Sequence, residues 1–442
     1  MRYAIILAGG KGTRLASRLN GKPKPLVDIA GVPLLERQML LLKHCGFDSV
    51  MILVNYQAEQ IVHFCLERQN FGMNITIVDD GEPRGTAGAV LAALSTIPAE
   101  VEDFLVVYGD TLLNVNLERL LAFHAQHEGD ASLFLHPNDH PHDSDLVELD
   151  ADGRITAFHP YPHPEGAELA NLVNAALYVV RRGALAPWLM LAQQPPRVID
   201  FAKDLFPQML ACGKRLYGWC SHEYIRDVGT PERLDKAERD IASGIYQNGS
   251  SVTPRPAVFL DRDGVINKEV GFLCCREQFS LLPGAGDAIR KLNRAGWLVI
   301  VVTNQPVLAR GECSEEELRA IHARMDTLLG DCGAFIDRLY ICPHHPDKGF
   351  AGEVPELKIA CTCRKPEPGL LLRAQTDMNI ELRKSWLVGD RTGDILAGQR
   401  AGVRTILVQT GDAGKDGKYA VQPDFVRADL AAAVETILSD DK

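Results

Sequence analysis

Asp261 and Asp263 are the residues whose types and spacing have the clearest chemical meaning in this sequence. They follow the apolar run Ala257–Leu260 and precede Gly264, which permits the tight turn that exposes both side chains. One carboxylate can attack phosphorus and form an aspartyl-phosphate, while the other protonates the leaving alkoxide and then deprotonates the attacking water. Mg²⁺ would let the anionic nucleophile approach an anionic phosphate. Because Asp-x-Asp pairs are common in loops, the position after a strand and before glycine carries this prediction.

Three further segments supply groups that fit the same chemistry. Thr303 and Asn304 end an apolar run with a hydroxyl and an amide that can hold phosphate oxygens. Lys365 can neutralise a phosphate and the charge that develops in the transition state. Asp390 ends another apolar run with an acidic metal ligand. Since open α/β sheets bind ligands at the carboxyl ends of their strands, these groups are predicted to meet in one site.

A second metal site is predicted from cysteine and histidine spacing. Cys342 and His344 form a Cys-x-His pair, and Cys361 and Cys363 form a Cys-x-Cys pair. Four such ligands suffice for a closed tetrahedral site, and they favour Zn²⁺ over Mg²⁺ or Ca²⁺. All four positions are filled, so a structural role is predicted rather than a catalytic one. His345 stays open as the alternative to His344.

Taken together, residues 257–425 resemble the haloacid dehalogenase superfamily. The resemblance implies that Asp261 is the nucleophile, that Asp263 is the general acid and base, and that Thr303 and Lys365 stabilise the phosphoryl group. It also implies that Mg²⁺ is bound by Asp261, Asp263 and Asp390.

Within that superfamily, the Cys-x-His pair is similar to the pattern of D-glycero-D-manno-heptose 1,7-bisphosphate phosphatases, with histidinol-phosphate phosphatases as close kin. This likeness implies that Asn304, Arg310 and Arg364 contact the substrate. The sequence departs from the family at Pro306-Val307, where Ser-Gly is usual, and in the segment Glu269–Cys275, which is expected to border the substrate.

In the first half of the chain, a glycine-rich turn follows the apolar run Tyr3–Leu7. Its glycines, Gly9, Gly10 and Gly12, let backbone N–H groups approach a triphosphate, and Arg14 adds a fork of donors. The spacing matches neither the Gly-x-Gly-x-x-Gly pattern nor a Walker loop.

Five more residues of this half have plausible roles at a nucleotide site. Lys24 is a cation flanked by two prolines, and Gly85-Thr86 begins a second small-residue turn where a flat base could lie. Asp110 and Asp227 are far apart in the sequence, and each stands at the end of an expected element. One Mg²⁺ held by both could bridge a nucleotide and a sugar phosphate.

Residues 1 to about 240 resemble sugar-1-phosphate nucleotidyltransferases. The resemblance implies that Asp110 and Asp227 are the metal pair and that Asn174 and Lys203 face the sugar phosphate. It assigns the triphosphate to Gly9, Gly10, Gly12, Thr13, Arg14 and Lys24. The sequence departs from the family pattern at Ala176, where Gly is common, and at Arg84, where Leu is common. Neither departure removes a charged catalytic group.

The elements that must position these residues form two similar series. Apolar, β-branched runs alternate with helical stretches in both halves, which is typical of parallel α/β units. Strands are expected at 3–7, 50–54, 75–78, 104–107 and 176–180, and again at 257–260, 298–302, 338–341, 385–388 and 405–408. We predict an α/β chain with an N-terminal Rossmann-like nucleotidyltransferase domain (1–243, mixed, mostly parallel sheet), a linker (244–256) and a C-terminal haloacid dehalogenase-like Rossmannoid domain with a zinc loop (257–442).

Composition narrows the class of partners. The 442 residues carry a formal net charge of −11, which argues against a nucleic-acid partner but not against small phosphorylated substrates. No run of apolar residues is long enough to predict a membrane span. The N-terminal run ends in a glycine loop and is interpreted as a strand, so a cytoplasmic enzyme with reduced thiols is expected.

The two motif sets together predict a bifunctional enzyme of nucleotide-activated heptose synthesis. The C-terminal domain would remove the 7-phosphate of the heptose bisphosphate, and the N-terminal domain would then transfer a nucleotidyl group to heptose 1-phosphate. GTP is the expected donor, since this half looks closest to mannose- and heptose-1-phosphate guanylyltransferases, with UTP, CTP and dTTP open. One alternative is a histidinol-phosphate or other small-molecule phosphatase whose N-terminal domain senses nucleotide or is a mannose-1-phosphate guanylyltransferase. Another is a scaffold whose zinc loop recruits a protein.

Overall fold

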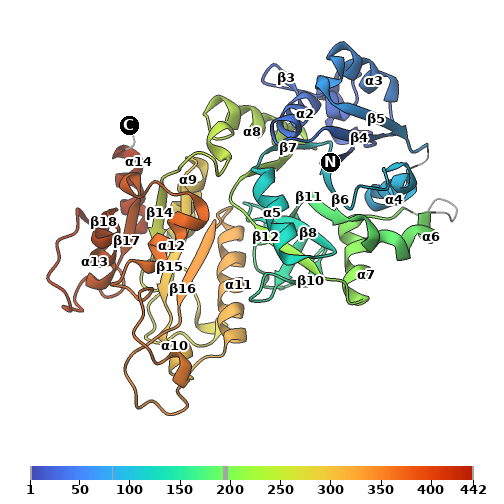
Figure 1. The fold of residues 1–442 in the computed structure, drawn as a ribbon. Coiled ribbons are helices and arrows are strands. Elements are labelled where there is room, and N and C mark those ends of the chain that lie inside the picture. The colour runs from blue at the N-terminus through green and yellow to red at the C-terminus, as the bar shows by residue number, and fades with distance from the viewer. Residues whose placement is uncertain (1, 82, 193–197, 441–442) are drawn as a thin grey trace. The chain divides into compact units, whose positions relative to one another are not determined.

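The computed structural model describes residues 2–81, 83–192 and 198–440, and the chain divides into two compact units (Figure 1). The first unit comprises residues 1–136, 147–160 and 174–250, and the second comprises 137–146, 161–173 and 251–442. The division at 250/251 falls inside the segment predicted as a linker. Two earlier segments of the chain nevertheless belong to the second unit. One of them is held to α11 (Glu315–Asp331), where the N–H of Asn171 donates to Asp326 Oδ2 (3.0 Å) and the N–H of Leu169 donates to Thr327 Oγ1 (3.2 Å).

The first unit is built on a mixed sheet. Its main path runs β10-β9-β11-β6-β1-β4-β5, and β12 pairs with β8, which joins the sheet through β11. β1 is parallel to both β4 and β6, whereas β11 is antiparallel to β6. The bounds are β1 Tyr3–Leu7, β4 Ser49–Val54, β5 Asn74–Asp79, β6 Asp103–Tyr108, β8 Ala131–His136, β9 Leu146–Leu149, β10 Ile155–His159, β11 Val173–Arg181 and β12 Leu216–Cys220.

Helices and two short ribbons complete this unit. The strand pair β7 (Thr111–Asn114) and β13 (Tyr224–Asp227) is antiparallel, and β2 (Asp28–Ile29) pairs with β3 (Val32–Pro33). The helices are α1 Ala16–Leu19, α2 Leu34–His44, α3 Ala58–Glu67, α4 Gly85–Ala93, α5 Leu117–His127, α6 Leu189–Ala192, α7 Phe206–Ala211 and α8 Pro231–Ala242.

The second unit has a parallel sheet in the order β16-β15-β14-β17-β18-β19. Its strands are β14 Ala257–Leu260, β15 Leu298–Asn304, β16 Arg338–Cys342, β17 Trp386–Gly389, β18 Arg404–Val408 and β19 Phe425–Arg427. Its helices, besides α11, are α9 Ala285–Arg294, α10 Pro306–Ala309, α12 Gly369–Met378, α13 Thr392–Ala401 and α14 Leu430–Asp440.

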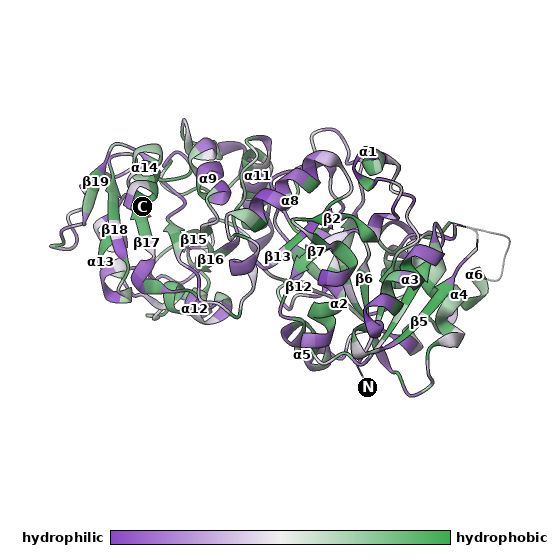
Figure 2. Cartoon of the chain, turned by 90° about the horizontal axis from the view of Figure 1, so that it is seen from above, coloured by the Kyte–Doolittle hydropathy of each residue, from purple (hydrophilic) through white to green (hydrophobic). Residues whose placement is uncertain are grey.

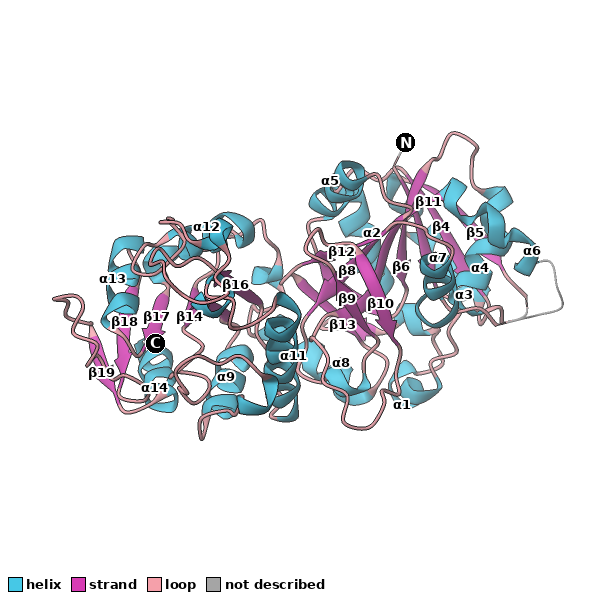
Figure 3. Cartoon of the chain, turned by 90° about the horizontal axis from the view of Figure 1, so that it is seen from below, coloured by secondary structure: helices cyan, strands magenta, loops and turns pink. Residues whose placement is uncertain are grey.

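Alternation along β14 explains why both faces of this sheet are covered (Figure 3). Successive strand residues point to opposite faces. Val258 and Leu260 join a core with residues of α9, α11 and α14, whereas Ala257 and Phe259 join a second core with residues of α12 and α13. Figure 2 shows the same pattern as apolar strands between helices of mixed polarity.

The predicted fold class and all ten expected strands are confirmed. The remaining strands, most of which are short, were not predicted: β2, β3, β7 to β10, β12, β13 and β19. Within the described residues, no helix combines the length and apolar character needed to cross a membrane.

Ala176 adopts a left-handed backbone conformation, with φ of 57°, inside β11. It stands where the resembled nucleotidyltransferases commonly have glycine. An L-residue in this region costs roughly 1–2 kcal/mol, so the departure from the family pattern is a strained position in this fold.

We therefore expect Ala176→Gly to raise the free energy of unfolding of the first unit by about 0.5–1 kcal/mol. Glycine removes the strain of the left-handed conformation from the folded state, which stabilises it. This gain exceeds the roughly 0.4–1 kcal/mol of stability that is lost because glycine makes the unfolded chain more flexible. The measurement is the urea midpoint of that unit's transition. Ala175→Gly is the matched control, because Ala175 is not among the positive-φ residues and glycine there should destabilise by about 0.5–1 kcal/mol. Equal losses at both positions would contradict the argument.

Candidate active sites

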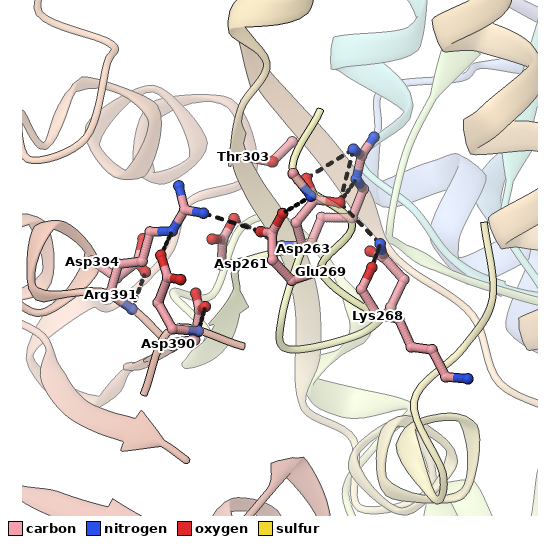
Figure 4. Close-up of polar contacts among 12 residues, drawn as sticks. Asp261, Asp263, Lys268, Glu269, Thr303, Asp390, Arg391 and Asp394 are labelled. Atoms are coloured by element: carbon pink, nitrogen blue, oxygen red, sulfur yellow. Dashed lines mark hydrogen bonds and ion pairs between the residues drawn. The ribbon is translucent and has the colours of Figure 1, made fainter. Parts of the chain in front are cut away.

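The carboxyl ends of β14, β15 and β17 bring one group of predicted residues together (Figure 4). β14 is paired in parallel with β15 on one side and with β17 on the other. Asp261, Thr303 and Asp390 therefore leave neighbouring strands at the same edge. The N–H of Asp261 donates to the carbonyl of Val388 (3.0 Å), which ties the start of the Asp261 turn to β17.

A buried group of three carboxylates lies at this edge. One oxygen each of Asp261, Asp390 and Asp394 lies within 4.8 Å of the others. Asp390 Oδ2 accepts the N–H of Asp412 (2.7 Å), while its Oδ1 is buried without a hydrogen-bond partner among the described residues. Gly264 is required beside them, because its φ is 80° and a Cβ there would lie 2.5 Å from Asp390 Oδ2.

Lys365 is the cation of this group. Its Nζ lies 2.9 Å from Asp261 Oδ1 and 2.6 Å from Asp394 Oδ1. Asn304 clamps the Lys365 backbone, accepting its N–H at Oδ1 (3.0 Å) and donating from Nδ2 to its carbonyl (3.1 Å). In this arrangement Asn304, predicted as a substrate contact, orients the lysine.

The electrostatics of the group favour a divalent cation. Burial raises the pKa of Asp261 to about 6, although Lys365 opposes the shift. Burial, followed by the neighbouring Asp261 and Asp394, raises the pKa of Asp390 to about 8. The ammonium of Lys365 pairs with Asp261 and Asp394, and one buried oxygen of Asp390 has no donor among the residues that the structure describes. An oxygen-rich, net-negative site of this kind fits Mg²⁺.

Asp263, which is predicted as a ligand of the same Mg²⁺, is not one of the three grouped side-chain carboxylates. Its side chain accepts hydrogen bonds from Arg262, from Asn267 Nδ2 (2.9 Å) and from Gln305 Nε2 (2.9 Å). Burial alone would raise its pKa, but the Arg262 guanidinium and these donors outweigh burial and hold the pKa below its usual value. The carboxylate is therefore held ionised, as a proton acceptor requires. Gln305 Nε2 also donates to Thr303 Oγ1 (2.8 Å).

The four residues predicted to bind zinc form one cluster. Sulfur–sulfur distances among Cys342, Cys361 and Cys363 are 3.3 to 3.6 Å, and His344 Nδ1 lies 3.3 Å from Cys363 Sγ and 3.8 Å from Cys342 Sγ. Metal–sulfur bonds of about 2.3 Å would separate tetrahedral sulfurs by about 3.8 Å, so the cluster has nearly the size of a metal site. His345 lies outside it, and its Nδ1 accepts the N–H of Asp347 (3.3 Å).

Of the two arginines predicted to contact substrate, Arg364 adjoins this cluster and Arg310 lies over two aromatic rings. Arg364 follows Cys363 and donates to the carbonyl of His344 (3.1 Å). The Arg310 guanidinium lies between the rings of Phe272 (4.0 Å) and Phe350 (4.5 Å). Phe272 belongs to the unusual segment Glu269–Cys275, so that segment borders a predicted substrate contact.

In the first unit, a cleft of about 250 Å³ opens at the end of β1. Its lining includes these predicted residues: Gly9, Gly10, Lys24, Gly85, Thr86 and Asp110. Gly85 is required there, since its φ is 75° and a Cβ would lie 2.5 Å from the Ile199 carbonyl oxygen. The cleft is also lined by three residues that were not predicted, Asn55, Asp80 and Tyr108. They stand at the ends of β4, β5 and β6, and only the order of these strands in the sheet brings them to the cleft.

The predicted metal pair is brought to one side of this cleft. Lys24 Nζ contacts Asp110 Oδ2, and the N–H of Val228 donates to the Asp110 carbonyl (2.9 Å). Asp227 contacts Arg233, yet its Oδ1 is buried without a hydrogen-bond partner among the described residues. A Cβ at Gly229 would lie 2.7 Å from Asp227 Oδ1 and 3.2 Å from Lys24 Nζ, so both charges converge on this glycine. An orphaned carboxylate oxygen here suits a cation.

The remaining predicted nucleotide and sugar contacts do not line the cleft. Gly12 begins the short helical turn Thr13–Leu15, where Thr13 and Arg14 are exposed. Lys203 is also exposed, on a helical turn that the Asp200 side chain caps. The Thr86 hydroxyl donates a hydrogen bond to Asp200 (2.8 Å). Asn174 is half-buried, and its Nδ2 has no partner among the described residues.

Sequence reasoning overlooked Asp394 as a member of the carboxylate group. It stands four residues after Asp390, in the first turn of α13, where its Oδ2 accepts the N–H of Arg391 (3.1 Å). An acidic residue at that distance from a strand-end aspartate is a signal that could have found it.

Fold and sites together define an α/β chain that combines a nucleotide-binding transferase unit with a phosphatase unit. The family profile described as "Nucleotidyl transferase" matches residues 3–244, and that described as "HAD-hydrolase-like" matches 362–433. D-glycero-D-manno-heptose-1,7-bisphosphate 7-phosphatase of Thermosynechococcus vestitus is 44% identical over 189 residues, which are 42% of this chain and 96% of that protein. The chain therefore belongs to the nucleotidyl transferase family and to the family of heptose-bisphosphate phosphatases, and it is an enzyme with both kinds of domain.

Solved structures similar to parts of this chain include the following two. One is D,D-heptose 1,7-bisphosphate phosphatase from B. bronchiseptica complexed with magnesium and phosphate, 34% identical, covering 42% of this chain and 99% of that chain with a TM-score of 0.38. The other is HddC from Yersinia pseudotuberculosis complexed with GMP-PN, 25% identical, covering 55% of this chain and all of that chain with a TM-score of 0.45.

The raised pKa values predict how Mg²⁺ and pH act together on the phosphatase unit. Asp261 and Asp390 have folded-state pKa values near 6 and 8, above the unfolded value. The folded site therefore binds more protons, and metal-free stability falls as pH rises from about 4 to about 8. Mg²⁺ at about tenfold its Kd should restore about 1.4 kcal/mol near pH 8, and much less near pH 5, where protons occupy the ligands.

Thermal unfolding with and without Mg²⁺ at the two pH values measures this effect. Asp390→Asn should lose most of the gain at the higher pH, and Asp424→Asn, outside the site, should keep it. A gain that is equal at both pH values would contradict the assignment.

Proposed function

We propose that this chain performs two consecutive steps in the synthesis of a nucleotide-activated heptose. The C-terminal domain (257–442) would hydrolyse the 7-phosphate of D-glycero-D-manno-heptose 1,7-bisphosphate. The N-terminal domain (1–243), which a linker (244–256) joins to the phosphatase domain, would then join the remaining heptose 1-phosphate to a nucleotide and release pyrophosphate. The observation that carries the proposal is that one chain holds both the carboxylate–lysine group of Asp261 and the cleft of Lys24 and Asp110. The 44% identical relative is a D-glycero-D-manno-heptose-1,7-bisphosphate 7-phosphatase, which supports the choice of sugar.

In the phosphatase step, Asp261 attacks phosphorus and the bond to the sugar oxygen breaks. Asp263, whose carboxylate is held ionised in the resting site, must take up a proton before this step and then passes it to the leaving oxygen. It then accepts a proton from the water that attacks the aspartyl-phosphate, which releases inorganic phosphate and regenerates Asp261. Lys365, whose Nζ lies 2.9 Å from the nucleophile, offsets the phosphoryl charge, and Thr303 adds a hydroxyl. Mg²⁺, held by Asp261, Asp390 and Asp394, would reduce the repulsion between the two anions.

Substrate recognition at this site is assigned to Arg310 and Arg364. Both are guanidinium groups that can bind a phosphate in two-point fashion. Arg364 is anchored to the Cys/His loop and Arg310 is held between two rings, so neither must be ordered when the substrate arrives. We assign the phosphate that is not hydrolysed to this pair.

In the transferase step, an oxygen of the sugar phosphate attacks the α-phosphorus of the nucleotide and pyrophosphate leaves. This reaction needs no protein nucleophile, so the chain's task is positioning and charge neutralisation. Backbone N–H groups of the Gly9-Gly10 turn and the ammonium of Lys24 would bind the triphosphate. Mg²⁺ held by Asp110 and Asp227 would neutralise its charge. Arg14, Gly12, Thr13, Asn174 and Lys203 complete the proposed contacts with nucleotide and sugar phosphate.

GTP is the proposed donor, on the resemblance of this half to guanylyltransferases. We propose that the enzyme works in the bacterial cytoplasm, where its product would feed lipopolysaccharide, capsule or S-layer glycan synthesis.

The proposal is tested by incubating the whole protein with the α- and β-heptose bisphosphates and each of the four NTPs, and measuring products by mass spectrometry. We expect phosphate release followed by GDP-heptose. Asp261→Asn should reduce phosphate release by about 10²-fold or more while leaving nucleotidyl transfer to supplied heptose 1-phosphate intact. Asp110→Asn should do the reverse, so each variant is the control for the other. Phosphate release without any NDP-heptose would reject the two-step proposal, and an inert Asp110→Asn would favour a nucleotide-sensing domain.

We also propose that Cys342, His344, Cys361 and Cys363 bind a structural Zn²⁺. The cluster has the ligand types and the size that tetrahedral zinc requires. The segment that leaves the cluster carries Arg364 and Lys365, so the metal would fix two cations of the site.

Metal analysis of the purified protein should therefore find about one zinc per chain, in line with one four-ligand site. Cys361→Ser should lower the zinc content and reduce phosphatase activity, because Arg364 and Lys365 lose their anchor, while nucleotidyl transfer stays unchanged. Cys212→Ser, at an exposed free cysteine outside the cluster, is the control and should keep its zinc. Full phosphatase activity in zinc-free protein would refute a structural role for the metal.

A further inference from the structure

Arg262, between the two aspartates of the phosphatase motif, is fully buried. Its guanidinium is shared between two partners. Nη2 donates to Asp263 Oδ2 (2.8 Å) and Oδ1 (3.0 Å), and Nε adds a longer contact to Oδ1 (3.3 Å). Nη1 points the other way and donates to Nε2 of His322 (3.0 Å). The arginine therefore spans the space between the proposed general acid and base and one histidine.

His322 comes from a rigid element. It lies on the buried face of α11, whose residues Leu318, Ile321, Met325 and Leu329 are part of the core. The helix begins with a capping box between Ser314 and Glu317, which fixes its first turn. The position of the His322 ring is thus set by the fold and not by the site.

Only a neutral imidazole can accept this hydrogen bond. Burial, and then the positive charge of Arg262, lower the pKa of His322 to about 3, so the ring is uncharged under working conditions. Arginine has donors only, and a buried donor without an acceptor costs roughly 1–3 kcal/mol. If the His322 acceptor were lost, the Arg262 guanidinium would turn toward other acceptors. This movement would disturb its hydrogen bonds to Asp263.

We infer that His322 is a positioning residue of the phosphatase, which acts through Arg262 to fix the carboxylate of Asp263. The alternative is that His322 only fills space beside a buried arginine. The inference rests on the role proposed for Asp263 but not on the identity of the sugar, so it is tested with a generic aryl phosphate as substrate.

Two variants separate these explanations. His322→Phe keeps a ring of similar size but offers no acceptor, whereas His322→Gln offers an amide oxygen to Arg262. We expect His322→Phe to lower kcat for phosphate release by about tenfold, the order of one lost hydrogen bond of 1.4 kcal/mol, with KM changed less than about twofold. His322→Gln should recover most of kcat. Equal kcat in both variants and the wild type would overturn the inference.

A double-mutant cycle tests whether the effect passes through Asp263. In an Asp263→Asn background, His322→Phe should have little further effect on the residual rate, because the group it positions is already lost. A full additional tenfold loss would overturn the inference. Nucleotidyl transfer by the same preparations reports on the integrity of the chain. Should His322→Phe not fold, His322→Met replaces it under the same criteria.

Discussion

The charge imbalance at the carboxyl edge of the second sheet is the constraint on which the phosphatase site depends. Three carboxylates, of Asp261, Asp390 and Asp394, are buried within 4.8 Å of one another beside the single ammonium of Lys365. Burial, and after it the repulsion between these carboxylates, raises the pKa of Asp261 and Asp390 and costs stability unless a cation enters. The hydrophobic cores on the two faces of β14 stabilise the fold enough to keep these carboxylates buried together, which is unfavourable by itself.

Two supports keep the groups of this site in place, and neither belongs to the carboxylate cluster. The backbone of Lys365 is bound by the Asn304 side chain at the end of β15. The Cys/His cluster ends at Cys363, two residues before this lysine. Asp263 is held by Arg262, Asn267 and Gln305. The nucleophile and the acid and base are thereby oriented by separate parts of the chain. A disturbance of the cysteine loop should reach the lysine first, and a disturbance of α11 should reach Asp263 first.

Much of this could be predicted from the sequence, because the strand-end aspartates, the glycine turns and the Cys/His spacing are local patterns. The strands carrying Asp261, Thr303 and Asp390 were all predicted, and parallel pairing then brings their ends together. The role of Asn304 and the contact between Arg262 and His322 could not be predicted. They depend on which helix packs over β14 and on the path of the loop that leads to Lys365. Asp263 was expected among the metal ligands because it stands two residues after Asp261. Its side chain instead accepts hydrogen bonds from Arg262, Asn267 and Gln305.

The placement of residues 137–146 and 161–173 in the second unit has a consequence for how the halves of this enzyme can be separated. A fragment that starts at residue 251 contains the whole phosphatase motif set, yet it lacks the N–H groups of Leu169 and Asn171 that reach Thr327 and Asp326. Asp326 would then be a carboxyl group without the donor that offsets its burial. The linker in the sequence and the boundary of the compact unit therefore differ, so a cut at the linker alone removes contacts that α11 makes in this chain.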